Sequence, residues 1–280
     1  MSARLGSHAI VLSRIGEDQL GHDAVEMLKS FPIDLGHLQI DDAHPTGSVS
    51  VTFVEGQPSY TIAEPVAWDM LDFTPDWQEL AAHVDAVCFG SLAQRGTNSQ
   101  STIQSFLAAT KPECVRVFDV NLRTPFYSRG VLESSLERAT VLKMNDEEVP
   151  RVLSLLGLRQ DETHNPPSSE ELVSAANLLL DEFPLQLVCI TRGGHGSVLV
   201  SSRETHFHPG VPTTIADTIG AGDAFTAALT HYYLQGAPLP TLNEAGNRWG
   251  SWVASQSGAM PPLAEDVATS LRDQIAMVAG

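Results

Sequence analysis

Short apolar runs alternate with amphipathic stretches along most of the 280-residue chain. Runs of this length are typical of strands that are buried on both faces of a parallel sheet. They cover residues 8–13, 85–90, 114–121, 139–145 and 185–192. Strands that alternate with helices predict a doubly wound, mostly parallel sheet with helices on both of its faces. We therefore expect an α/β fold.

Residues 169–183 carry the clearest helical pattern between these runs. Four apolar residues in this segment fall on one helix face: Leu172, Ala175, Ala176 and Leu179. Ser168 and Glu171 have the spacing of a capping box, in which each side chain bonds the other residue's backbone amide. The pattern predicts a helix that begins at the residue after Ser168.

Residues 47–62 break the pattern of buried runs. Polar residues at 48, 50 and 52 alternate with apolar residues at 49, 51 and 53, and a Gly56–Pro58 turn follows. Strict alternation predicts a half-exposed antiparallel hairpin. We expect one domain over 1–280, in which 44–64 form a small β lid, a dimer surface or both. An ordinary surface hairpin is the alternative.

The acidic balance of the chain excludes two classes of partner. Sixteen Lys and Arg against 34 Asp and Glu give a formal net charge of -18. Such a field repels nucleic-acid backbones and anionic lipid, so we expect neither a nucleic acid nor a membrane as partner. No apolar stretch approaches the roughly 20 residues that a membrane helix needs.

The three cysteines lie in apolar runs, at positions 88, 114 and 189. An odd count without a close pair argues against a disulfide framework, and we expect buried thiols. The first residues show no signal-peptide pattern. These features predict a soluble protein of the reducing cytoplasm.

A glycine-containing stretch at 216–236 carries the strongest functional signal. The apolar periodicity of Phe225, Leu229 and Tyr232 predicts a helix directly after Gly220-Ala221-Gly222. Backbone amides at a helix start have no helical partner, and small residues let an anion approach them closely. The stretch therefore predicts a phosphate site that uses no lysine.

Asp223 follows this predicted anion site immediately. A carboxylate at a helix start is often a simple cap. Beside a transferring phosphoryl group it also suits a general base that deprotonates an acceptor hydroxyl. Both interpretations follow from the residues alone.

The segment "DTIGAGDAF" (217–225) resembles the signature of the ribokinase-like (PfkB) family of carbohydrate kinases. It differs from a Walker loop, because no GK[ST] follows the glycines. The resemblance implies an ATP-dependent transfer of a phosphoryl group to a sugar hydroxyl, with Asp223 as catalytic base. It also implies that Gly220, Ala221 and Gly222 stabilise the developing charge.

Two further stretches resemble the nucleotide side of this family. "LKMNDEEV" (142–149) is similar to its N-x-x-E motif, in which Asn145 and Glu148 organise Mg²⁺ and the phosphates largely through water. These two residues are also spaced like a helix capping pair. "ITRGGHGSVLV" (190–200) is similar to the nucleotide-binding turn, and a tight hairpin is its alternative. The ATP contacts implied there are Thr191, Arg192, Gly193 and Gly196.

The segment 243–262 resembles the helix and loop that flank adenine in the family, with Asn247 and Gly258 at matching places. Many relatives bind a monovalent cation near this loop. The resemblance puts a K⁺ site near Asp217, Ile219, Val253 and Gly258, mostly through backbone carbonyls. Side chains alone do not identify such a site.

The segments 88–95 and 118–128 resemble the fructokinase branch of the family. The resemblance implies a sugar site at the ends of two strands, where doubly wound sheets place their ligands. Its residues are Phe89, Gly90, Asp119, Asn121 and Arg123. Fructose is the acceptor that this branch implies. Ribose, a keto-deoxy sugar acid or a nucleoside are alternatives, and a homodimer through the lid is expected.

The resemblance covers nearly the whole chain but begins late. Family members usually open with a strand that ends in a substrate-binding aspartate, followed by a Gly-Gly motif, and residues 1–20 resemble the unit after these. We expect that this βα unit is absent, either because the record begins at an internal methionine or because the protein is a natural short form. A catalytically silent nucleotide-binding relative is therefore the alternative to an active kinase.

Overall fold

The computed structural model describes residues 1–54, 57–159 and 167–278. The chain divides into two compact units. Unit 1 contains residues 1–5, 84–92 and 112–280, and unit 2 contains residues 6–83 and 93–111.

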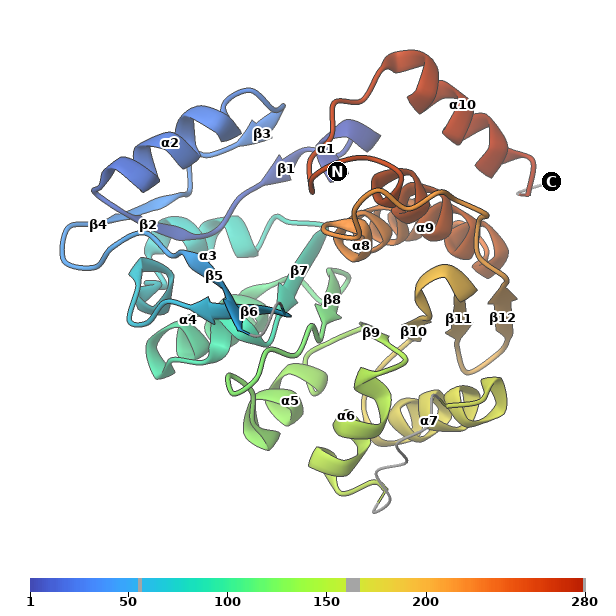
Figure 1. Ribbon diagram of the computed structural model, residues 1–280. Coiled ribbons are helices and arrows are strands. Elements are labelled where there is room, and N and C mark those ends of the chain that lie inside the picture. The colour runs from blue at the N-terminus through green and yellow to red at the C-terminus, as the bar shows by residue number, and fades with distance from the viewer. Residues whose placement is uncertain (55–56, 160–166, 279–280) are drawn as a thin grey trace. The chain divides into compact units, whose positions relative to one another are not determined.

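A six-stranded sheet forms the centre of unit 1, in the order β12-β11-β10-β9-β8-β7. Strands β7 to β10 run parallel to one another, and β11 and β12 are antiparallel. Their bounds are β7 Ala86–Gly90, β8 Val115–Asp119, β9 Val141–Asn145, β10 Leu187–Thr191, β11 Ser197–Val200 and β12 Thr205–His208. The four predicted parallel strands from 85 to 192 are therefore confirmed (Figure 1).

Helices cover both faces of this sheet, as predicted. One face packs against α5 (Arg129–Leu136), α6 (Glu148–Leu156) and α7 (Ser169–Glu182). The other packs against α8 (Ala221–Leu234) and α9 (Leu239–Ala254). Two further helices, α1 (Ser2–Leu5) and α10 (Glu265–Ala276), pack on α8 and α9 around the fully buried Trp249.

The two-residue period of the strands assigns each side chain to a face. In β8, Phe118 belongs to the core under α5 to α7, whereas Val117 belongs to the core under α8 and α9. Asp119 and Lys143 share the parity of the second set and lie on the α8 face. The predicted helix at 169–183 is α7, and its capping box between Ser168 and Glu171 is present.

Unit 2 contains short strands and three helices in its described residues. β1 (Ala9–Ile10) pairs with β3 (Ile33–Asp34) and β2 (Arg14–Gly16) with β4 (Gln39–Asp41), both in parallel. β5 (Val49–Val54) and β6 (Gln57–Ile62) form an antiparallel hairpin. The helices are α2 (Gln19–Leu28), α3 (Pro75–Ala81) and α4 (Thr97–Ala109), with a 3₁₀ turn η1 at Ala67–Met70.

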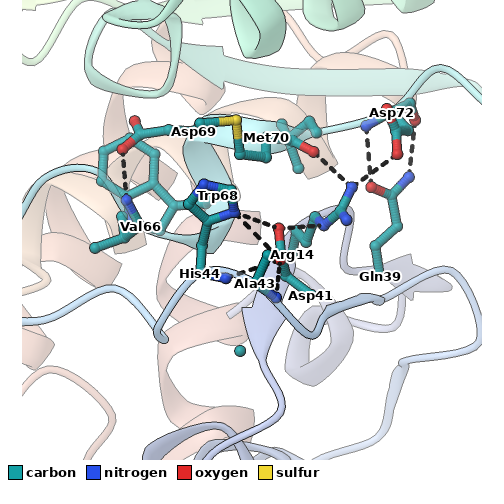
Figure 2. Close-up of polar contacts among 12 residues, drawn as sticks. Arg14, Gln39, Asp41, Ala43, His44, Val66, Trp68, Asp69, Met70 and Asp72 are labelled. Atoms are coloured by element: carbon teal, nitrogen blue, oxygen red, sulfur yellow. Dashed lines mark hydrogen bonds and ion pairs between the residues drawn. The ribbon is translucent and has the colours of Figure 1, made fainter.

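A network of polar side chains connects strands β2 and β4 of unit 2 to the segment around η1 (Figure 2). The Arg14 guanidinium lies 2.9 Å from Asp41 and 2.7 Å from Asp72, and it donates to the carbonyl of Met70. Asp41 also accepts the backbone amides of Ala43 and His44. The buried carboxylate of Asp41 therefore links the turn after β4 to Arg14 of β2.

Two sequence-based expectations need correction, and one is confirmed. Residues 8–13 do not form a buried strand: β1 has two half-buried residues and pairs only with β3 among the described strands. Cys114 and Cys189 are buried as expected, but Cys88 is exposed. The hairpin at 47–62 is confirmed, although its turn at 55–56 lies outside the described residues. Within the described chain, no helix has the length and apolarity needed to cross a bilayer.

Candidate active site

The carboxyl ends of the parallel strands in unit 1 align several predicted site residues. Gly90 of β7 pairs with Asp119 of β8, which pairs with Lys143 of β9. Asn145 of β9 pairs with Thr191 of β10. Ligands of doubly wound sheets bind at this edge. The register therefore brings the predicted sugar-side and nucleotide-side residues to one edge of one sheet.

The N-cap residue of helix α8 is Gly220, which adopts a left-handed conformation with φ of 80°. A Cβ at this position would lie 2.8 Å from the carbonyl oxygen of Ala259. Gly220 is therefore required both for its backbone angle and for the close approach of the loop at Ala259. These constraints set the direction in which the first amides of the helix point.

Two of the first amides of α8 are available to an anion. The amide of Ala221 donates to Thr218 at 3.2 Å, so the expectation that all the amides of this turn are unpaired is wrong for this one. For Gly222 and Asp223, no acceptor in the described chain takes the amide hydrogen. The Asp223 side chain is exposed beside them. The helix start thus offers two donors and one carboxylate, a set that fits a nucleotide phosphate next to an acceptor hydroxyl.

A buried ion pair lies under this turn. The Lys143 ammonium donates to both carboxylate oxygens of Asp119, at 3.0 and 3.1 Å. The hydroxyl of Thr226 on α8 donates to the same carboxylate at 2.8 Å. Both charged residues are about nine-tenths buried, with exposures of 7% each. The carboxylate of Asp119, a predicted sugar contact, is therefore bonded to Lys143 and Thr226, which both belong to unit 1.

Asn145 and Glu148 bond one another at the end of β9. The amide of Asn145 donates to Glu148 Oε2 at 2.8 Å, and the amide of Glu148 donates to Asn145 Oδ1 at 2.9 Å. The amide of Leu122 donates to Glu148 Oε1 at 2.7 Å. The capping-pair alternative is therefore present in the structure. Each carboxylate oxygen keeps a further lone pair, so the pair also fits a magnesium ion held through water.

The predicted nucleotide-binding turn joins β10 to β11. It contains a 3₁₀ turn, η3 (Gly193–His195), and both Gly193 and Gly196 have positive φ, as the tight-hairpin alternative requires. A Cβ on Gly196 would lie 2.0 Å from the carbonyl oxygen of His208. The Arg192 guanidinium donates to Ser169 and to the carbonyl of His195. Arg192 therefore stabilises the turn itself.

The loops at 216–220 and 254–258 lie side by side at the start of α8. The amides of residues 216 and 217 donate to the carbonyl of Ala254. The Asp217 carboxylate accepts the amides of Ile219 and Gly258, at 2.9 and 3.1 Å. Val253 is buried beneath them, with 1% exposure. Three of the four residues predicted around a monovalent cation thus lie in these two adjacent loops, and the fourth, Val253, lies directly before the second loop, at the end of α9.

Asn247 belongs to a buried polar network between α9 and β11. Its side-chain amide donates to Ser197 at 2.7 Å and to the carbonyl of Asn243 at 2.8 Å. Its exposure is 6%. The network ties the helix to the strand that follows the turn at Gly196.

The remaining sugar-side residues lie around the end of β8. Phe89 stacks on Phe118 with ring centroids 5.2 Å apart and packs against the core. Asn121 is exposed and has φ of 43°, the one positive φ among the described residues other than glycine. Arg123 is exposed and donates to the carbonyl of Leu122. A strained polar residue at a strand end is typical of a ligand site.

Lys143 and Thr226 were not identified from the sequence as site residues. The signal for Lys143 was its charge inside the otherwise apolar run 141–144, at a position whose strand neighbours are buried. The signal for Thr226 was its place three residues after Asp223, on the same helix face. Neither signal names a partner, because the pair with Asp119 depends on the register of β8 and β9.

An α/β sheet with two unpaired helix-start amides and an exposed carboxylate at its carboxyl edge is typical of an enzyme that binds a phosphorylated ligand. The model of the pfkB family carbohydrate kinases matches residues 1–266. The chain therefore belongs to the pfkB family of carbohydrate kinases, and it is a sugar kinase with a ribokinase-like fold.

Individual relatives agree with this assignment. The chain is 26% identical over 266 residues to an uncharacterized sugar kinase of Pyrococcus horikoshii, covering 92% of this chain and 78% of the relative. It is 27% identical over 280 residues to a fructokinase of Salmonella typhimurium, covering 93% and 84%.

Solved structures show the same fold. A structure of the Pyrococcus kinase matches with a TM-score of 0.81 at 24% identity, covering 100% of this chain and 86% of that one. The fructokinase of Vibrio cholerae O395, solved with fructose, ADP and calcium, matches with a TM-score of 0.75 at 23% identity, covering 100% and 88%.

Proposed function

We propose that this sugar kinase transfers the γ-phosphoryl group of Mg·ATP to a hydroxyl of a small sugar, with fructose as the preferred acceptor. The observation that carries the proposal is the exposed Asp223 carboxylate directly beside the two available amides of α8. The fructokinases among the relatives support fructose as the acceptor.

Asp223 acts as the general base in this proposal. Its carboxylate takes the proton of the acceptor hydroxyl while that oxygen forms a bond to the γ-phosphorus and the bond to the ADP oxygen breaks. The amides of Gly222 and Asp223 donate to the phosphoryl oxygens as charge develops on them. Gly220 and Ala221 hold the turn in this conformation.

Asn145 and Glu148 would hold Mg²⁺ through water molecules. The ion supplies charge neutralisation for the phosphates when it is bound. The nucleotide side of the site is lined by Thr191 and by the turn through Arg192, Gly193 and Gly196. The adenine ring is flanked by Asn247 and Gly258.

The two adjacent loops at Asp217 and Gly258 are a proposed site for K⁺. Backbone carbonyls of residues 217, 219 and 253 would be the ligands. The hydrogen bonds from Ile219 and Gly258 to the Asp217 carboxylate support the proposal, because they hold both loops in place.

Asn121, Arg123 and Gly90 are the proposed sugar contacts at the end of β8, with Phe89 packed behind them and Asp119 as a further predicted contact. An exposed guanidinium at this edge also favours a second candidate acceptor, a keto-deoxy sugar acid, because Arg123 can pair with a carboxylate. Turnover of sugar acids that is lost in Arg123→Gln would support that acceptor.

We also propose that the hairpin within 44–64 contributes to a homodimer. Val49 at its start is an apolar side chain with 56% exposure, so a partner surface can cover it. Light scattering on the full chain and on Val49→Glu tests this proposal. A monomeric wild type would contradict it.

Coupled ADP release over fructose, ribose, a keto-deoxy sugar acid and a nucleoside tests the acceptor. In Asp223→Asn, we expect kcat to fall by about 10²–10⁴-fold while Mg·ATP binding is retained. Asp266→Asn is the matched control, because Asp266 is an exposed carboxylate in the first turn of another helix.

Two outcomes contradict the proposal. Unchanged turnover in Asp223→Asn would show that Asp223 is not the general base. Binding of Mg·ATP without turnover on any acceptor would indicate a catalytically silent nucleotide-binding relative.

A further inference from the structure

The proposed mechanism gives no role to Lys143, which forms an ion pair with Asp119 in unit 1. The pair is buried, bidentate and tied to α8 by the hydroxyl of Thr226. Replacing such a pair with apolar side chains is often neutral or stabilising, so a purely structural role does not explain it well. Its location under the first turn of α8 suggests a functional one.

The Lys143 ammonium lies close to the proposed phosphate site. Its Nζ atom is 3.2 Å from the point that a Cβ on Gly222 would occupy. Gly222 is one of the two residues whose amides are available to an anion. The absence of a side chain at Gly222 thus leaves the space beside the lysine open.

The ammonium is fully engaged with its partner. The Lys143 Nζ atom donates to both oxygens of the Asp119 carboxylate, at 3.0 and 3.1 Å. The Asp119 charge is compensated by the same contact. A carboxylate without this partner would repel a phosphate at the helix start, since the low-dielectric surroundings screen it weakly.

We propose that Lys143 is a positioning residue for phosphoryl transfer: it neutralises Asp119 beneath the first turn of α8 and thereby keeps the Gly222–Asp223 amides favourable for the phosphates of Mg·ATP. The inference rests on the proposed function, because it assigns the anion at α8 to ATP. It gives Asp119 a role as the counter-ion of Lys143, in addition to its predicted contact with the sugar.

Thr226 connects the Asp119–Lys143 pair to helix α8, which carries Asp223. Its hydroxyl lies 2.8 Å from Asp119 Oδ2 and 3.0 Å from the carbonyl oxygen of Gly222. A change in the position of the carboxylate is therefore transmitted directly to the turn that carries Asp223.

The test compares the Mg·ATP dissociation constants of four proteins by calorimetry: wild type, Lys143→Met, Asp119→Asn and the double variant. In Lys143→Met, we expect affinity to fall by about 10- to 100-fold, because Asp119 is left without its counter-ion. The double variant removes both charges and should recover to within about threefold of wild type, given the usual scatter of such measurements. Lys29→Met, at an exposed lysine paired with Glu26, controls for the change in net charge.

A second comparison does not depend on whether Lys143→Met folds. Asp119→Asn keeps the ammonium beside the phosphate site without its partner, and we expect it to bind Mg·ATP about tenfold more tightly than the double variant. Conformation is checked by urea unfolding of each variant.

Three results would overturn the inference. They are wild-type affinity in a folded Lys143→Met, a double variant that binds as poorly as Lys143→Met, and equal affinity of Asp119→Asn and the double variant. Absence of Mg·ATP binding by the wild type would overturn the proposed function itself, and the inference with it. The two failures are thus distinguishable.

Discussion

Thr226 joins helix α8 to strand β8, because its hydroxyl donates a hydrogen bond of 2.8 Å to the carboxylate of Asp119. Asp223 lies three residues earlier on the same helix face. The position of the proposed base relative to the carboxyl edge of the sheet therefore depends on one side-chain contact in addition to the apolar packing of Phe225 and Leu229.

Thr226→Val should lower both stability and activity. Valine keeps the shape of threonine but cannot donate to Asp119, so we expect a loss of about 1 kcal/mol in the free energy of unfolding. We also expect a fall in kcat, because Asp223 loses a constraint. Thr230→Val is the control, since the Thr230 hydroxyl donates to the carbonyl of Thr226 within the same helix. Urea unfolding and coupled ADP release measure the two effects, and equal behaviour of both variants would contradict this prediction.

Gly220→Ala should damage the phosphate site more than a positive φ alone explains. An alanine in the left-handed region costs about 1 kcal/mol. At Gly220 its Cβ would also meet the carbonyl of Ala259 at 2.8 Å and displace the first turn of α8. Gly236, just beyond the same helix, has φ of 72°, and no atom of the described residues lies within 4 Å of its Cβ position.

Gly236→Ala therefore isolates the cost of the backbone angle. We expect the KM for Mg·ATP to rise in Gly220→Ala and to stay at the wild-type value in Gly236→Ala. Initial rates over a range of ATP concentrations measure both values. A similar KM in the two variants would show that the contact with Ala259 has no effect on the site.

The sequence predicts the local features of this site well, because each depends on a few neighbouring residues. The helix after Gly222, the capping box at Ser168 and the hairpin at 47–62 follow from periodicity and cap spacing, and the structure contains all three. The resemblance to the ribokinase-like family rests on the same local motifs, and the family match confirms it.

Features that depend on strand register could not be predicted in the same way. Lys143 meets Asp119 only because β8 and β9 pair in one particular register, and 24 residues separate them. The expectation of a buried strand at 8–13 also failed, because apolar composition does not determine how many partners a strand finds. The ion pair of Lys143 and the pairing of residues 8–13 both depend on residues that are distant in the sequence.

Asp41 should make the stability of the protein depend on acid pH. Burial would raise the pKa of Asp41, but the amides of Ala43 and His44, the His44 ring and Arg14 outweigh it, and the pKa is lowered. A lowered pKa contributes stability above the unfolded value of about 3.9, and this contribution is lost as the pH falls through the folded value.

In Asp41→Asn, we expect a lower melting temperature at pH 7 and a difference from wild type that shrinks below about pH 4. Asp42→Asn is the matched control, because the neighbouring Asp42 is exposed. Thermal melting from pH 3 to pH 8 measures the effect. A difference that stays constant over this range would show that the carboxylate charge of Asp41 does not contribute.

Two arginine ion pairs of equal length should differ sharply in their contribution to stability. Arg95 lies 2.7 Å from Asp69 within unit 2, with side-chain exposures of 4% and 8%. Arg129 lies 2.7 Å from Glu133 on the surface of α5, with exposures of 60% and 36%. The buried guanidinium also donates to the carbonyl of Ala63 and lies 4.0 Å from the Trp68 ring centroid.

Arg95→Met leaves the Asp69 carboxylate buried without its cation, and we expect a loss of about 3–5 kcal/mol. Arg129→Met removes a solvent-screened pair and should cost less than about 1 kcal/mol. Urea unfolding of both variants measures the difference. Arg95→Met with Asp69→Asn should recover part of the loss, because no buried charge then remains unpaired. Equal losses in the two single variants would mean that burial does not determine the strength of these pairs, since their N–O distances are the same.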